Sequence, residues 1–515
     1  MKHSRNFPNY LTLGIACLGA GLAGAGTAAG GSDVWFEPLT KSADVVLPND
    51  MEELLEPWVT PSGITQVNLL SLREVEDAIL SPTQSIIRVP AGTSSSMFDM
   101  LAYDDTGEFL FIPHETPFGA GVSRHDIAAR STHILFQGDS KGINGDWSGD
   151  YGAFDPCRFT PNGSLFLAEE WTAEGRVIEV LNPFAAPADI QIRELDSIAN
   201  VAHEGINFSE KDKKVIYYID EWNSGSIYKF VMSRAGDYTK GQTFVLSVDD
   251  FKGDPAANWD EGTNVSEART GLATWVPLTN RWGQSLPGIR DPFKNGPTTD
   301  PRTDPDTRGG RGAADDAGGT PYGRPEDMEV GRLRNGNEVL YVAATSENTI
   351  YTFEILNESK VNVGRLISPD TPKNAGHAPT TGVLNSPDNL AQDALGNIYV
   401  IEDAPNNSNI GGDIWFARDK NNDGVAESLD HFMSIRADGC EATGMIFNPV
   451  KPLEFVVAVM HPDSTDLAKV PDGLGDAVWQ FDLAAIDNQR FVTHLRRASR
   501  ENRHGYGQFR DDDRE

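Results

Sequence analysis

The sequence predicts an all-β protein, a six-bladed β-propeller with a long insertion, and three observations support this fold class. A short pattern occurs six times, in which four to six apolar, β-forming residues end at an acidic residue or a histidine. Most copies are followed by a second strand at hairpin distance. Where the spacing is uninterrupted, copies lie about 50–60 residues apart, somewhat more than one four-stranded blade requires. The copies are residues 107–115, 163–171, 213–222, 337–347, 396–404 and 453–461.

The number of blades depends on the interval between the third and fourth copies, which is about twice the usual period. Its second half, residues 285–322, is rich in Gly, Pro, Asp and Arg, so we interpret it as a long inserted loop. Six blades with this insertion are the first interpretation. The alternative is seven blades, with residues 241–250 beginning another sheet.

The two ends of the chain differ in composition from the strand repeats. Basic residues precede a short apolar stretch, 11–22, and a small-residue cleavage sequence, so residues 1–29 are interpreted as a secretory signal peptide. The propeller domain is expected over 33–495, followed by a charged, disordered tail over 496–515. The leader predicts a periplasmic or extracellular protein, and no later segment predicts stable membrane insertion.

The overall charge limits the partners. The formal net charge is -33, so nucleic acid and anionic membrane surfaces would be repelled, whereas cations would be attracted. With 39% hydrophobic residues the chain can form a core. We expect a monomer that acts on a small molecule.

Acidic residues recur where the predicted strands end. Propeller strands converge on a central channel, so acids at successive strand ends would gather at one mouth of it. Each acid taken alone is better explained as a surface or loop residue than as a metal ligand. Together they predict several bound metal ions, because crowded carboxylates repel one another unless cations compensate. The candidates are Glu169, Glu170, Glu204, Asp220, Glu221, Glu326, Asp327, Asp388 and Glu441.

The segment from Arg324 to Glu329 concentrates three carboxylates and a guanidinium in six residues. Pro325 disfavours helix at Arg324, which indicates an irregular turn whose acids point one way. Either Arg324 pairs with these acids or a hard metal ion binds among them. A solvated charged turn is the simpler alternative.

A second candidate site is the loop that begins at Asp419. Oxygen ligands at Asp419, Asn421 and Asp423, a glycine at position six and Asp430 at position twelve match the needs of calcium. The loop differs from an EF-hand because position twelve is Asp and no helices flank it. A structural calcium site is predicted here, and an Asx-turn cluster is the alternative.

Two cysteines, Cys157 and Cys440, follow the predicted leader. In an exported protein they could form one disulfide, or one of them could be a thiolate metal ligand, and the sequence leaves both open. No GxSxG, Walker or HExxH motif occurs, so serine hydrolase, P-loop and zincin chemistry find no support.

Several segments together resemble the PhoX-type alkaline phosphatases, and they occur in the order of that family. The segments are a cysteine before TPNGSLFLAEE (160–170), HEGINF to IYKF (203–230), TWVPL (274–278), AGGTPYGRPEDMEV (317–330), SPDNL to GNIYV (386–400) and CEATGMIFNP to VVAVMHP (440–462). The resemblance implies an exported six-bladed propeller that hydrolyses phosphomonoesters with an iron pair (Fe3+) and calcium ions (Ca2+). A metal-bound oxygen would be the nucleophile.

The resemblance also implies roles for individual residues. Arg324 would bind the phosphoryl oxygens of a small phosphate ester, and Cys157 would be an iron ligand. The implied carboxylate ligands are Glu204, Glu326, Asp327 and Glu441, shared between iron and calcium, with Glu170 and Asp388 as peripheral calcium ligands.

Two other functions are compatible with the predicted fold. SPDNL and GNIYV would also suit a calcium-dependent lactonase or phosphotriesterase of the gluconolactonase type, which needs no thiolate ligand. The third is a non-catalytic, calcium-stabilised propeller that serves as a binding module.

Overall fold

The computed structural model describes residues 33–47, 55–77, 98–171, 175–251, 268–293, 309–466, 470 and 473–498. The expected signal peptide, 1–29, lies outside the described residues, as does the expected tail from 499 onward. The described start of that tail is not disordered as expected, because residues 489–498 form a helix.

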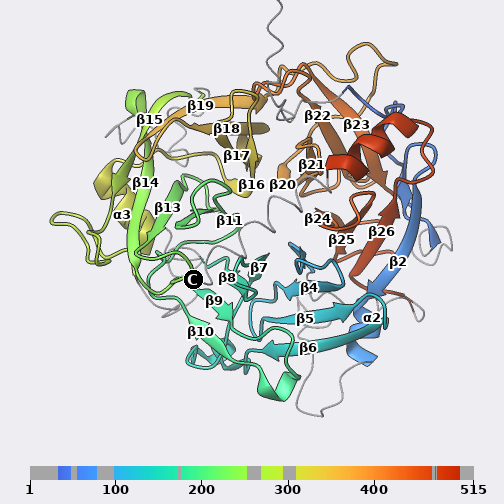
Figure 1. The fold of residues 1–515 in the computed structure, drawn as a ribbon. Coiled ribbons are helices and arrows are strands. Elements are labelled where there is room, and N and C mark those ends of the chain that lie inside the picture. Colours follow the sequence, from blue (N-terminus) through green and yellow to red (C-terminus); the bar gives the residue numbers. More distant parts are fainter. Residues whose placement is uncertain are drawn as a thin grey trace, which may run out of the picture.

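The described chain is all-β with a propeller-like arrangement, as predicted: five antiparallel sheets surround a common centre (Figure 1). The first four-stranded sheet contains β3 (Ala102–Tyr103), β4 (Phe109–His114), β5 (Gly121–Asp126) and β6 (Ser131–Gln137). The second contains β7 (Phe154–Phe159), β8 (Leu165–Glu169), β9 (Val177–Val180) and β10 (Ile192–Glu194).

The largest sheet has nine strands. Their spatial order is β11 (Ile206–Phe208), β12 (Val215–Ile219), β13 (Ile227–Met232), β14 (Gly241–Val248), β15 (Gly271–Pro277), β19 (Lys360–Ile367), β18 (Thr349–Ile355), β17 (Glu338–Ala344) and β16 (Pro325–Arg332). Residues 241–250 therefore do not begin a separate sheet, because β14 pairs with β13 on one side and β15 on the other.

Two further sheets complete the ring. One contains β20 (Pro387–Gln392), β21 (Ile398–Glu402), β22 (Asp413–Arg418), β23 (Ser428–Ile435) and β1 (Trp58–Val59). The other contains β24 (Glu441–Phe447), β25 (Glu454–Met460), β26 (Ala477–Asp482) and β2 (Thr65–Ser71). Strand β2 comes from the N-terminal part of the chain and pairs with β26, so it links the two ends of the ring (Figure 1).

Helical elements are short and lie between strands. They are α2 (Leu72–Asp77), α3 (Gly309–Ala317), η1 (Lys141–Asn144), η2 (Pro187–Asp189), η3 (Asp249–Phe251) and η6 (Thr345–Glu347). Helix α3 lies within 285–322, which was expected to be a loop throughout. Its Arg311 is buried against Asp220 (Nε to Oδ2, 2.7 Å), and this ion pair holds the segment on the propeller.

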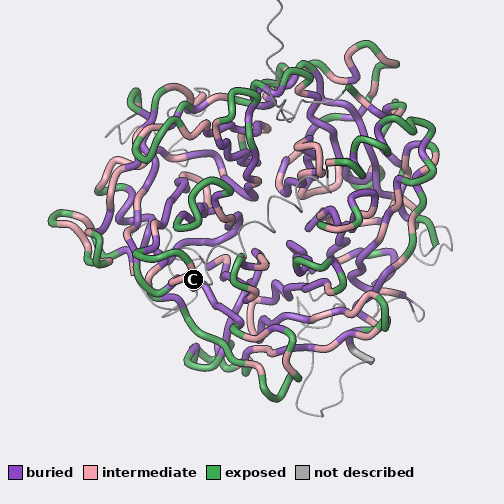
Figure 2. Tube along the Cα trace, viewed as in Figure 1, coloured by how far each residue is buried: buried purple, intermediate pink, exposed green. Residues whose placement is uncertain are grey.

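The core consists of apolar layers between neighbouring sheets. Phe111 of β4 and Leu167 of β8 belong to one buried cluster, and Leu110 of β4 and Val456 of β25 to another. Each sheet thus has neighbours on both faces, which explains why inner strands such as β21 read as continuous apolar runs. In Figure 2 the strands are mostly buried, while the exposed segments are largely the loops between them.

The ring closure generates a stability prediction. Leu70 of β2 is fully buried in a cluster with Val456 and Val478, so Leu70→Ala should leave a cavity and lower the free energy of unfolding by about 2–5 kcal/mol. Val67→Ala on the same strand is the control, because Val67 is 54% exposed. Urea unfolding measures both variants. Equal midpoints for the two would contradict the idea that β2 secures the ring through its buried face.

Candidate metal centre

A repeated backbone feature places acidic side chains at the centre. Strands β7, β16 and β20 each begin with one paired residue, followed by a register shift before pairing resumes. The residue before each strand has a positive φ: Ala153 49°, Arg324 53° and Ser386 50°. These irregularities redirect the side chain that follows the first paired residue. That residue is Asp155 in β7, Glu326 in β16 and Asp388 in β20.

The same strand positions carry acids around the whole ring. Each pair of inner strands contributes one residue at the start of its first strand or up to three residues before it, and another one or two residues after the end of its second strand. These inner strands contact one another and surround the centre of Figure 1. The first set is Asp99, Asp155, Glu204, Glu326, Asp388 and Glu441, and the second is Glu115, Glu170, Glu221, Thr345, Asp403 and His461. We name the acids in these two sets the acidic ring.

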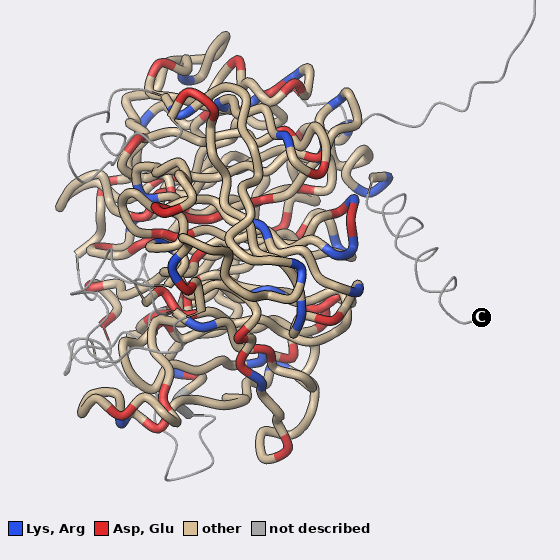
Figure 3. The backbone as a smooth tube through the Cα atoms, turned by 90° about the vertical axis from the view of Figure 1, so that its left-hand side faces the viewer, with Lys and Arg blue, Asp and Glu red and all other residues tan. Residues whose placement is uncertain are grey.

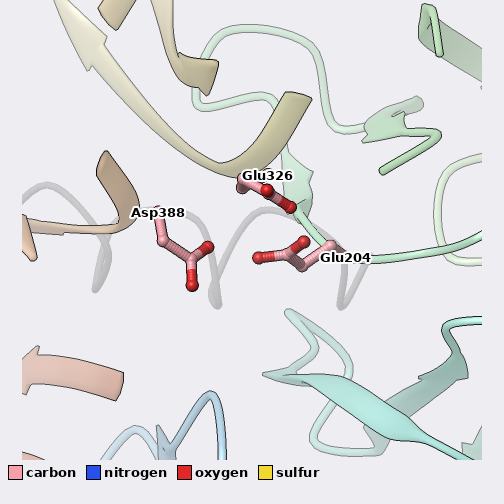
Figure 4. A group of neighbouring side chains, drawn as sticks. All are labelled: Glu204, Glu326 and Asp388. Carbon is pink, nitrogen blue, oxygen red and sulfur yellow. The ribbon is translucent and has the colours of Figure 1, made fainter. Parts of the chain in front are cut away.

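Three members of the acidic ring converge most closely. Glu204, Glu326 and Asp388 each offer an oxygen, and these oxygens all lie within 4.8 Å of one another (Figure 4). In the described part of the chain this is the one group of three or more potential acid, His or Cys ligands with such spacing. Glu204 and Glu326 lie at the two edges of the nine-stranded sheet, and Asp388 comes from the next sheet. The site is therefore assembled from segments far apart in sequence.

Burial and mutual repulsion make the charged forms of these acids unfavourable. Burial is the largest cause and raises the pKa of Glu326 to about 7 and those of Glu204 and Asp388 well above their ordinary values. Repulsion by Glu326 adds to the pKa of both other acids. Asp99 and Glu115 behave in the same way. Ionisation of several of these acids at once is therefore unfavourable unless a cation compensates their charge.

Arg324 lies beside this cluster. Its Nε is 2.6 Å from Glu221 Oε1 and 3.0 Å from Glu326 Oε1, and its Nη1 is 3.4 Å from Asp403 Oδ2. Burial raises the pKa of Glu221 to about 8 and that of Asp403 to about 7, although Arg324 opposes both shifts. The side chain of Arg324 remains 37% exposed, so its guanidinium lies at the boundary between the acidic ring and solvent.

Two further sequence candidates, Glu441 and Asp327, differ in placement. Glu441 is in the ring and pairs with His461 (Oε1 to Nε2, 3.2 Å). Burial lowers the pKa of His461, but the contact with Glu441 raises it by more, to about 9. Asp327 instead accepts hydrogen bonds from Met328 N (2.6 Å) and Leu390 N (3.0 Å), so it ties β16 to β20 and is not brought into the group of three.

Acid pairs at strand ends are divided between two roles. Glu169 forms a buried ion pair with Arg176 (2.7 Å), whereas the next residue, Glu170, belongs to the ring. Asp220 is likewise paired with Arg311, and Glu221 follows it. Glu169 and Asp220 thus meet arginines outside the centre, whereas Glu170 and Glu221 belong to the ring, where Glu221 contacts Arg324. The sequence alone listed both acids of each pair as equal candidates.

The two cysteines are both buried, and no disulfide joins them. Cys157 packs in the apolar cluster that contains Phe111 and Leu167, and burial raises the pKa of its thiol. Cys440 belongs to a different apolar cluster. The structure therefore does not bring Cys157 to the acidic ring, contrary to the expected role as an iron ligand.

The loop at Asp419 has the backbone pattern of an Asx turn. Asp419 accepts hydrogen bonds from the amides of Asp423 (3.2 Å) and Gly424 (2.7 Å). Asp430, the expected twelfth-position ligand, is buried and pairs with Arg418 (Oδ2 to Nε, 2.8 Å). Asp430 thus has a cationic partner within its own sheet, on the neighbouring strand β22. Calcium binding by Asp419, Asn421 and Asp423 stays a prediction.

Sequence reasoning did not select several ring members as ligands. Glu115 and Asp403 follow the second inner strands of their sheets and lie within the recognised strand repeats, which also end at His461, so the pattern contained a signal for them. Asp99 and Asp155 precede or begin first strands, where no run of apolar residues marks the preceding segment. Whether these two acids face the centre depends on the register of their strands, which the sequence pattern does not reveal.

The donor set fits cations that prefer oxygen. Asp99 Oδ1, Asp155 Oδ1, Glu221 Oε2 and Glu326 Oε2 are buried without a hydrogen-bond partner. Unpartnered carboxylate oxygens in a crowded acidic site are the ligands that calcium and other hard cations use. A thiolate ligand at Cys157 does not fit this arrangement. Figure 3 shows acidic residues distributed throughout the rest of the molecule as well, so placement rather than abundance distinguishes the ring.

Comparisons with known proteins identify the family. A family model described as alkaline phosphatase PhoX matches residues 145–463, more than half of the sequence. The chain belongs to the PhoX alkaline phosphatase family, as the sequence motifs indicated. A search of curated proteins found no match.

No helix among the described residues is both long and apolar enough to cross a membrane.

A solved phosphatase structure has the same overall fold. Pseudomonas fluorescens PhoX, in complex with vanadate as a transition state analogue, is 14% identical with a TM-score of 0.56, over 87% of this chain and 98% of that chain. A gluconolactonase from Xanthomonas campestris is 8% identical with a TM-score of 0.40, over 86% and 97% of the two chains. Regucalcin, a calcium-binding protein from Agrobacterium tumefaciens, is 9% identical with a TM-score of 0.33, over 76% of this chain and 90% of that chain. The last two similarities are too low to support an argument.

The raised pKa values predict how pH affects the metal-free protein. Glu326, Asp403 and Glu221 bind protons more tightly in the native state than in the unfolded state, so their contribution is complete at low pH. It is lost as pH rises through about 7 to 8. In chelator, the melting temperature should therefore fall between about pH 5 and pH 8. Added calcium should reverse that fall.

Thermal unfolding at a series of pH values, with chelator and with excess calcium, checks this prediction. Glu221→Gln is the matched variant, because it removes the acid with the highest stated pKa and should flatten the upper part of the chelator curve. A melting temperature that rises with pH in chelator would contradict the assignment.

Proposed function

We propose that this protein is an exported, metal-dependent phosphatase that hydrolyses small phosphomonoesters. The observation that supports it best is the position of Arg324, which lies against the acidic ring and belongs to the segment shared with the PhoX family. A ring able to hold several cations, with an arginine at its exposed edge, suits an anionic phosphoryl group.

In this proposal the acids and the arginine have separate tasks. Glu204, Glu326 and Asp388 would hold cations at the centre, with Glu170 and Glu441 as further ligands and Ca2+ as the first candidate ion. The bound cations would supply charge stabilisation and activation of water for attack on phosphorus. Arg324 would orient two phosphoryl oxygens with its planar fork and stabilise the charge that develops on them.

Cation binding would release Arg324 for this role. In the metal-free ring its guanidinium compensates Glu221, Glu326 and Asp403. Cations bound by these carboxylates would take over the compensation, which leaves the guanidinium donors available to substrate. The exposed fraction of Arg324 provides the side from which a small ester would approach.

The proposal includes the finer features of the fold and location. We propose that β11–β14 and β16–β19 are two blades bridged by β15, which gives six blades in all. The protein would be a periplasmic or extracellular monomer after removal of the signal peptide.

Arg324→Lys tests the proposed clamp. The substitution keeps one positive charge but removes the planar pair of donors, so turnover of an aryl phosphate should fall by roughly a hundredfold. Metal content, measured by elemental analysis, should be unchanged. A variant with wild-type turnover would remove Arg324 from the mechanism.

Glu326→Gln tests the proposed metal ligand. The neutral amide keeps the size of the side chain but is a weaker ligand, so metal content and phosphatase activity should fall together. Glu329→Gln is the control, because Glu329 is on the same strand but faces Arg158 (3.8 Å). If the metal-loaded wild type cleaves lactones and no phosphate ester, the gluconolactonase-type alternative replaces the proposed function.

A further inference from the structure

We propose that Asp155 is a metal ligand in the acidic ring and that the centre binds its cations through oxygen ligands alone, with Cys157 serving only the apolar core. The inference rests on the proposed function, because it concerns the same cations. It differs from the expectation of a thiolate ligand, and it specifies which class of ion the site selects.

The backbone gives Asp155 the position of a ligand. It follows the first paired residue of β7, as Glu326 does in β16 and Asp388 does in β20, and the register shift lies between Phe154 and Cys157. Glu326 and Asp388 already belong to the group of three converging acids. Asp155 is therefore the equivalent residue of its own sheet.

The surroundings of Asp155 are those of an incomplete site. Its side chain is almost fully buried, at 5% exposure, and its Oδ1 has no hydrogen-bond partner. The acids that interact with it are Asp99, Glu115, Glu170 and Asp388. In the described part of the chain no ion pair reaches Asp99, Glu115, Asp155 or Glu170. The ion pairs of Arg324 and His461 are made with other ring members, namely Glu221, Glu326, Asp403 and Glu441. A buried carboxylate with only acidic neighbours requires a cation when it is ionised.

Cys157 lies on the other side of the same strand. Pairing of β7 with β8 resumes at Cys157, which is opposite Leu167, and both side chains belong to the apolar cluster between the first and second sheets. Cys157 as a whole is only 3% exposed. A thiolate there would be an unpaired charge among aromatic and aliphatic groups, which is strongly unfavourable.

The ligand class follows from the donor atoms. Carboxylate oxygens select hard cations such as Ca2+ and Mn2+. An iron ion bound at this centre would have oxygen ligands from the protein and no sulfur ligand. Thiolate would instead favour softer, thiophilic metals. Within this proposal the centre takes calcium readily and forms no metal–sulfur bond with any cation.

The test compares two substitutions in the full-length mature protein. Asp155→Asn should lower the calcium bound per chain after dialysis by about one equivalent, because the calcium ion that Asp155 binds would lose a charged ligand. It should also reduce the rise in melting temperature on calcium addition. Cys157→Ala should leave both quantities at the wild-type value. Asp393→Asn is the matched control, because Asp393 is a buried aspartate that directly follows β20 and accepts hydrogen bonds from Asn397 instead of belonging to the ring.

A spectroscopic measurement on the wild type covers the case in which Asp155→Asn fails to fold. Protein loaded with Co2+ should show no thiolate-to-metal charge-transfer band. A band that disappears in Cys157→Ala would overturn the proposal, as would full calcium content in folded Asp155→Asn. If Asp155→Asn loses calcium but the wild type cleaves no phosphate ester, this inference is supported and the proposed function is rejected. Full calcium in that variant with an active wild type would reject this inference alone.

Discussion

The crowding of carboxylates at the centre is the constraint on which the rest of the structure depends. Acids from every sheet meet where the inner strands converge, and burial holds their pKa values above the usual range. Arg324 and His461 compensate part of this charge. The remainder calls for cations from outside, because buried carboxylates without partners are costly when ionised. In the proposed function, both the stability and the chemistry of this site would depend on bound cations.

The propeller-like architecture makes that crowding possible. Apolar layers between the sheets fix the inner strands, and β2 from the N-terminal part completes the last sheet against β26. Rigid packing of this kind prevents the acids from moving apart to relieve repulsion. The register shifts near Asp155, Glu326 and Asp388 then turn single side chains inward without disturbing the sheets behind them.

Arginines outside the ring separate structural acids from candidate ligands. Arg176 and Arg311 neutralise Glu169 and Asp220, each adjacent in sequence to a ring member. Arg311 comes from α3, so part of the insertion supports the inner strand that carries Glu221. This division leaves one acid of each pair for the centre. It also explains how a protein with net charge -33 can bury so many acids in a defined arrangement.

The sequence by itself determined the all-β class and the family, because the strand repeats and the motif around Arg324 are local patterns of residue type. It also selected Glu204, Glu326, Asp388 and Glu441, since acids at strand ends must converge. Only the tertiary structure placed Asp155 among the other central acids, Cys157 in an apolar cluster and Asp430 against Arg418. The physical reason is register: one extra residue in a strand exchanges the side chain that faces the centre with the one that faces the core, and sequence composition does not record it.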